Sequence, residues 1–134
     1  MVKFRAWHKT WEEMGKVKRI RFDDEGNITT VLVKGQAFGS NVHLEEIELM
    51  QSTGLKDENS KEIFEGDILE VTDKHSWLEV VSYSQEKVMF VTEEINREFK
   101  VPESPLYDLS DSTFLKFKVI GNIYENSELL EVEG

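Results

Sequence analysis

Short stretches of the chain alternate apolar and polar residues, a pattern typical of strands with one buried face. The first stretch has an apolar residue at every second position, namely at Val2, Phe4 and Ala6. Lys3, Arg5 and Trp7 fill the positions between them. The helical period of 3.6 residues is weak almost everywhere. The pattern therefore predicts a mainly β protein.

A hairpin is predicted near the N-terminus. Strand-like residues 17–22 and 28–33 flank the turn-forming segment 23–27, in which Gly26 can take the positive φ of a tight turn. In the first arm the apolar positions shift from one parity to the other between Val17 and Ile20, which predicts a β-bulge.

The next part of the chain combines turn signals with one strand. Residues 35–42 are polar and contain glycine, so we expect a loop there. Residues 47–51 alternate, which favours a strand over a single helical turn. Residues 52–66 hold several turn-forming residues and little hydrophobic mass, so a further loop is expected.

Strands are predicted again in the second half, over residues 67–72, 78–84 and 87–92, with the last two joined as a hairpin at 85–86. Prolines 102 and 105 lack a backbone N–H and predict a loop around Glu103. A final strand is expected over 116–124, bulged at Gly121. A short C-terminal helical turn should begin at Ser127.

The expected fold is an N-terminal β-hairpin sheet packed with a small C-terminal SH3-like barrel. The Gly66-Asp67 corner followed by an alternating strand is how many such barrels begin, an analogy that carries no functional weight. We expect one compact unit that divides into an N-terminal β region, 1–51, and a C-terminal SH3-like β-barrel region, 52–134.

Two sets of residues are expected to maintain this fold. Core positions follow from the alternation: Phe4, Ala6, Ile20, Val31, Val33, Ile68, Val71, Val80, Phe90, Phe117, Val119 and Ile123. The second set consists of candidate structural turn residues: Gly54, Asp57, Gly66, Asp67, Gly121 and Asn122.

Charge is distributed unevenly along the 134 residues. Residues 1–22 hold seven of the 16 basic residues and two acidic ones, within a chain of net charge −11. Opposite charges on two parts of a chain can attract one another within a molecule or between copies, or can simply solvate exposed strands. Cysteine is absent, which excludes disulfides and thiolate metal sites.

Three segments carry a family resemblance, namely residues 3–7, 49–68 and 119–126. Together and in this order they resemble the YopX family, which is carried by phages and prophages of Gram-positive bacteria. The resemblance implies a largely uncharacterised, oligomeric protein and supplies no catalytic residues. Ser60 and Ser127 depart from the glycine and proline of the family pattern, and both lie in turns.

The sequence offers little catalytic chemistry. His8, His43 and His75 are scattered, and the best local cluster is His43 with Glu45 and Glu46. No Gly-x-Ser-x-Gly elbow or phosphate-binding loop is present. We therefore expect a non-enzymatic protein without a cofactor or a bound metal.

The sequence thus favours an accessory protein that acts through homo-oligomerisation and protein–protein contacts. Its candidate self-association or partner surface comprises Arg5, Trp7, Trp11, Lys18, Arg19 and Arg21. A host or phage protein is a further expected partner. The alternative is a regulator that binds nucleic acid with the same basic strands. No signal peptide or membrane span is predicted, so we expect a soluble, cytoplasmic protein.

Overall fold

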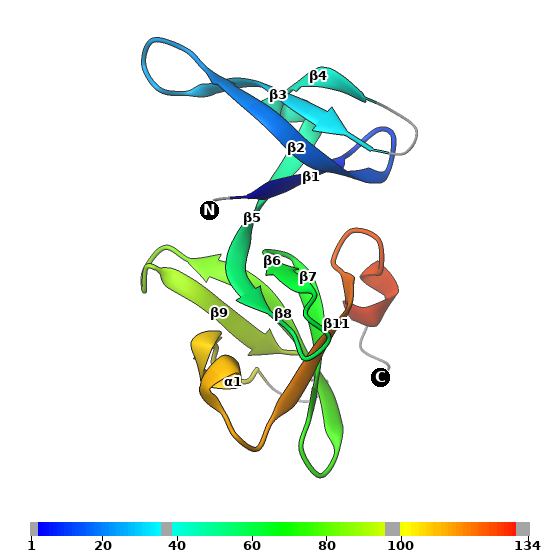
Figure 1. Ribbon diagram of the computed structural model, residues 1–134, viewed down its shortest axis with the longest axis vertical. Helices are drawn as coiled ribbons and strands as arrows, with labels where there is room; N and C mark the ends of the chain where they lie inside the picture. Colours follow the sequence, from blue (N-terminus) through cyan, green and yellow to red (C-terminus); the bar gives the residue numbers. More distant parts are fainter. Residues whose placement is uncertain (1–2, 36–38, 96–99, 131–134) are drawn as a thin grey trace. The chain divides into compact units, whose positions relative to one another are not determined.

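The fold comes from a computed structural model that describes residues 3–35, 39–95 and 100–130 (Figure 1). Its regular structure is mostly antiparallel strands, so the predicted mainly β class is confirmed. The chain divides into two compact units, Met1–Ser52 and Thr53–Gly134, hereafter unit 1 and unit 2.

Unit 1 is built on an antiparallel sheet with the strand order β4-β3-β2-β1-β5. Its elements are β1 (Phe4–His8), β2 (Glu13–Phe22), β3 (Ile28–Lys34), β4 (Gly39–His43), the 3₁₀ helix η1 (Leu44–Glu46) and the first part of β5 (Ile47–Lys56). The hairpin of β2 and β3 is confirmed, and Gly26 in its turn has a φ of 85°. The predicted bulge is also confirmed, because the register shifts between Val17 and Arg19.

Two predictions in the middle of the chain are wrong. Within the expected loop 35–42, the segment from Gly39 onward forms β4, which pairs with β3 although only Val42 is buried. An edge strand needs one partner for its backbone and few apolar side chains, so its sequence resembles a loop. The loop expected over 52–66 instead contains the end of β5 and the short β6 (Glu62–Phe64). Residues 36–38 of the expected loop lie outside the described residues.

Unit 2 contains a second antiparallel sheet, of order β10-β9-β8-β7-β11. Its strands are β7 (Asp67–Thr72), β8 (Ser76–Ser84), β9 (Met89–Glu94), β10 (Ser104–Pro105) and β11 (Lys116–Asn122). The β8–β9 hairpin is confirmed. The bulge at Gly121 is also confirmed, since the β7–β11 register shifts between Val119 and Gly121. The predicted C-terminal turn is the 3₁₀ helix η2 (Ser127–Leu130).

Around the prolines the structure differs from the predicted loop. Ser104 and Pro105 form β10 at the edge of the sheet, where a residue without an N–H is tolerated. A one-and-a-half-turn helix, α1 (Tyr107–Asp111), follows it and buries Leu109. The helix is too short for a periodic signal, which explains why the sequence did not reveal it.

Each unit has its own core. In unit 1, Ala6, Val31, Val33, Val42 and Ile47 are buried together. In unit 2 the buried cluster consists of Ile63, Leu69, Val71, Val81, Leu106 and Leu109. Most predicted core residues are buried or pack against these clusters. The predicted list lacks seven members of the clusters. Four of them come from the segments read as loops, namely Val42, Ile63, Leu106 and Leu109, and the others are Ile47, Leu69 and Val81.

Candidate functional site

Basic side chains of unit 1 share one face of its sheet, the face opposite the core. Successive side chains of a strand point to opposite faces, and Ala6, Val17, Ile20 and Val33 point into the core. Their neighbours therefore point outward. We call the resulting surface the cationic face; it consists of Arg5, Lys16, Arg19, Arg21 and Lys34.

The strand register sets three of these cations in a row. Arg5 on β1 lies opposite Lys16 on β2, and Lys16 lies opposite Lys34 on β3. Neighbouring strands are about 4.8 Å apart. Like charges directly opposite one another destabilise a sheet. The Lys16–Lys34 pair therefore has a cost in folding free energy that an anionic partner would relieve.

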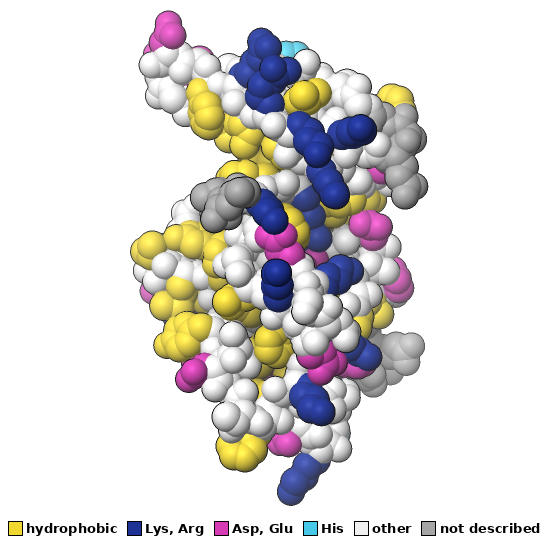
Figure 2. Space-filling view, viewed as in Figure 1, with side chains coloured by type: hydrophobic (Ala, Val, Ile, Leu, Met, Phe, Trp, Pro, Cys, Tyr) yellow, Lys and Arg dark blue, Asp and Glu magenta, His cyan; other side chains and the backbone are white. Residues whose placement is uncertain are grey.

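Four members of the cationic face have no compensating acid. The side chains of Lys16, Arg19, Arg21 and Lys34 are exposed and form no ion pair within the described part of the chain. Figure 2 shows Lys and Arg side chains gathered over the strands of unit 1. These charges are thus available to a partner.

The structure brings together only part of the predicted self-association surface. Arg5, Trp7, Arg19 and Arg21 lie on the outward face, and Lys18 occupies the bulge of β2. Trp11 lies apart from them in the β1–β2 turn, 55% exposed, where its ring packs edge-on against buried His8 at a centroid distance of 6.0 Å.

Sequence reasoning missed Lys16 and Lys34 as members of this surface. Lys16 directly precedes one core valine of the sheet and Lys34 directly follows another. Because successive side chains of a strand point to opposite faces, the alternation alone would have placed both lysines on the outward face. Their juxtaposition, however, depends on the β2–β3 register, which the bulge displaces.

The net charge of the protein resides in unit 2. Unit 1 contains eight basic and eight acidic residues, whereas unit 2 contains eight basic and nineteen acidic residues. Unit 2 therefore accounts for the whole net charge of −11. One copy of the chain presents both a cationic face and an acidic unit.

Asp57, a predicted turn residue, holds a turn of unit 2 together. Its Oδ1 accepts hydrogen bonds from the backbone N–H groups of Asn59 (2.9 Å) and Lys61 (2.8 Å), and its Oδ2 accepts one from Val119 (2.8 Å). Burial has the largest single effect and raises the pKa of Asp57, but these N–H groups and the Lys61 charge together lower that pKa below its ordinary value. The carboxylate is therefore structural.

The other predicted turn residues also have structural roles. Gly54 and Gly66 have φ angles of 81° and 86°, which favour glycine. The Asp67 Oδ2 accepts a hydrogen bond from the Phe64 N–H (2.8 Å). Asn122 Oδ1 accepts hydrogen bonds from two backbone N–H groups that follow it, those of Tyr124 and Glu125.

Gly121 is required for a different reason from Gly54 and Gly66. Its φ lies outside the left-handed region, but a Cβ at this position would overlap the side chain of Asn126. The Asn126 Oδ1 accepts a hydrogen bond from the Asn122 N–H (3.1 Å). Gly121 therefore leaves room for a side chain that fixes the C-terminal turn.

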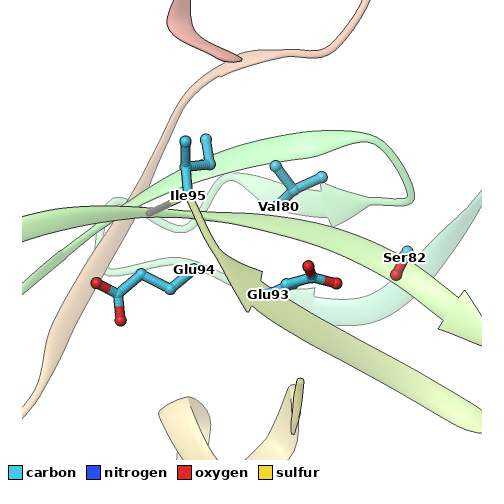
Figure 3. A pocket seen from close by; sticks show the side chains of 5 residues that line it. All are labelled: Val80, Ser82, Glu93, Glu94 and Ile95. Carbon is cyan, nitrogen blue, oxygen red and sulfur yellow. The ribbon is translucent and has the colours of Figure 1, made fainter. Parts of the chain in front are cut away.

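Unit 2 also has a pocket of about 160 Å³ at the end of the β8–β9 pair. Val80, Ser82, Glu93, Glu94 and Ile95 line it. In Figure 3 the Val80 and Ile95 side chains project from the same side of the sheet, and the Glu93 side chain extends toward Ser82. The Glu94 side chain points away from these four. The pocket thus combines an aliphatic wall with one carboxylate and one hydroxyl.

Among residues 3–35, 39–95 and 100–130 no cluster of three or more His, Cys, Asp or Glu side chains could hold a metal ion. The Glu46 carboxylate beside His43 instead accepts a hydrogen bond from the His43 backbone N–H (2.7 Å). In the same part of the chain, no helix has the length and apolar character needed to cross a membrane.

Comparison with known proteins gives one family and a structural relative. A family model described as "YopX protein" matches residues 3–131. The crystal structure of protein EF1440 from Enterococcus faecalis is similar over 98% of this chain and 99% of that chain, with 30% sequence identity and a TM-score of 0.69. No curated protein matches the chain.

Proposed function

The chain belongs to the YopX family, and from this premise we propose that it is a phage or prophage accessory protein that acts without catalysis, through homo-oligomerisation and protein–protein contacts in the host cytoplasm. The observation that supports this proposal is the cationic face of unit 1. An acidic protein surface is the partner that this face fits, and unit 2 of a second copy is such a surface.

Charge complementarity supports this pairing of copies. Complementary potentials speed encounter and fix the relative orientation of partners, while single exposed ion pairs add little affinity, about 0–1 kcal/mol each. A row of cations on a rigid sheet acts collectively, because its members are already fixed next to one another. The interface should therefore depend on several of these residues and weaken with salt.

The test is the native mass of the protein by light scattering at low and high salt. For the wild type we expect a discrete multiple of 15.6 kDa at low salt. The double variant Arg19→Glu/Arg21→Glu should shift to a smaller species, and its matched control, Lys74→Glu/Lys116→Glu on unit 2, should not. A wild type that is monomeric at every salt concentration contradicts the proposal.

A nucleic-acid partner is the second candidate, because a row of Arg5, Lys16 and Lys34 can equally follow a chain of phosphates. The acidic residues of unit 2 oppose it, since they repel a polyanion. Both candidates predict sensitivity to salt, so the ratio of absorbance at 260 and 280 nm across the scattering peak separates them. A ratio typical of nucleic acid would favour the second.

A further inference from the structure

The pocket of unit 2 lies on the face of the β8–β9 pair opposite the one that carries Val81 of the buried cluster. Val80 is directly opposite Glu93, and Val81, which is buried in the core cluster, is opposite Thr92. The pairing continues past the end of β9, because the Ile95 N–H donates a hydrogen bond to the Leu78 carbonyl (2.9 Å). Alternation therefore sets Glu93 and Ile95 on the same face as Val80.

The size of the pocket selects the class of ligand. Pockets for cofactors and small-molecule substrates commonly measure about 300–1,000 Å³, whereas one water needs about 10–15 Å³. At about 160 Å³ this pocket is too small for the former and far larger than a single-water site. One protein side chain is an occupant of the right size.

The charge of the pocket selects a cation. Glu93 is half-buried, and its carboxylate forms no hydrogen bond or ion pair with the described residues. Three other carboxylates of unit 2 have partners: Glu79 accepts a hydrogen bond from Trp77 Nε1 (2.7 Å), and Glu103 and Glu70 form ion pairs with Lys87 and Lys118. A partly desolvated carboxylate is unfavourable without a cation beside it.

Arginine fits the pocket better than a small cation. Its aliphatic stem can pack against Val80 and Ile95 while its planar guanidinium donates two parallel hydrogen bonds to the Glu93 carboxylate. The Ser82 hydroxyl, toward which Glu93 extends, can accept another.

We propose that the Glu93 pocket receives an arginine side chain of β2, Arg19 or Arg21, from a second copy of the chain. Both arginines are exposed on the cationic face and have no ion pair within the described residues. This inference rests on the proposed function, which needs an acidic acceptor on unit 2, and it assigns that acceptor to one residue.

The first experiment is a charge swap read by light scattering and sedimentation. Glu93→Gln keeps the shape of the side chain and should weaken association roughly tenfold, the effect of about 1.4 kcal/mol. Glu93→Arg should weaken association further. Combining Glu93→Arg with either Arg19→Glu or Arg21→Glu should restore association only when the substituted arginine is the one that enters the pocket. The control Asp108→Asn, on the exposed side of α1, should change nothing.

Two outcomes separate this inference from the proposed function. If Arg19→Glu/Arg21→Glu dissociates the oligomer but Glu93→Gln and Glu93→Arg do not, the pocket assignment is wrong while self-association stands. If the wild type is a monomer, self-association is wrong, and a second measurement decides the pocket.

That second measurement titrates the full chain with a synthetic peptide of residues 16–22, followed by the NMR methyl signals of Val80 and Ile95. Binding should shift both methyl signals in the wild type and neither of them in the Glu93→Gln variant. A peptide with glutamate in place of Arg19 and Arg21 is the control. Shifts of equal size with both peptides, or none with either, would overturn the pocket assignment regardless of the oligomeric state.

Discussion

The Asp57 carboxylate accepts a hydrogen bond of 2.8 Å from the backbone N–H of Val119, a residue 62 positions further along the chain. The same carboxylate closes its own turn through the N–H groups of Asn59 and Lys61. One side chain thus ties the turn after β5 to the final strand, β11. Unit 2 depends on this link because it joins segments distant in the sequence.

Replacing Asp57 by alanine should destabilise unit 2 by about 1–3 kcal/mol, because three backbone donors lose their acceptor. Urea unfolding followed by tryptophan fluorescence measures the change. Asp23→Ala is the control: its Oδ1 accepts similar bonds from Glu25 and Asn27, but in an exposed hairpin turn of unit 1. An Asp57→Ala loss no larger than the Asp23→Ala loss would show that the link to Val119 contributes nothing.

The stability that Asp57 provides should also depend on pH. Its pKa is lowered in the folded protein, so the unfolded chain binds the proton first as pH falls. The contribution is fully present above the unfolded pKa of about 3.9 and is lost as pH falls through the lower folded value. Urea midpoints of wild type and Asp57→Asn should therefore converge below about pH 4. A constant difference from pH 7 to pH 3 would contradict this reading.

Gly121→Ala should destabilise the protein by about 1–3 kcal/mol, because the added methyl group displaces the Asn126 side chain from its hydrogen bond with the Asn122 N–H. The same substitution in an Asn126→Ala background should cost less, since the overlap is gone. Thermal unfolding of the four proteins in this double-mutant cycle tests the coupling. Additive effects would mean that the strand itself, and not Asn126, requires glycine.

Ser60→Gly should stabilise the protein by about 1 kcal/mol. Ser60 has a φ of 64° in the turn that Asp57 closes, a conformation that costs a residue with a Cβ about 1–2 kcal/mol. Glycine avoids this cost, but its greater freedom in the unfolded chain offsets part of the stabilisation. Ser60→Ala is the matched control, because it keeps the Cβ and should give no gain. Equal melting temperatures for the glycine and alanine variants would refute the strain argument.

Lys34→Glu should affect stability and association in opposite directions. Opposite Lys16, a glutamate replaces a like-charge pair by an ion pair, which should add about 0.2–1 kcal/mol to folding. The same change removes a cation from the cationic face and should lower the native mass at low salt. Thermal unfolding and light scattering on one sample measure both effects, with Lys34→Gln separating loss of charge from its reversal.

Local pattern predicted much of the strand structure. Period-two alternation and turn residues located the β2–β3 and β8–β9 hairpins, and the shift of apolar parity between Val17 and Ile20 located a bulge. Such features arise from neighbouring residues, which the sequence lists in order. The pattern failed at β4 and β10, where backbone pairing with an adjacent strand forms an edge strand from polar or proline-containing sequence.

The sequence by itself determined the mainly β class, the family, the excess of acid and the basic character of the first strands. Only the tertiary structure decided which of these charges become neighbours. Lys16 meets Lys34, Asp57 meets the Val119 N–H and Glu93 faces Val80 because of strand register and bulges. Register depends on how whole strands pair across the sheet, and no local segment encodes that pairing.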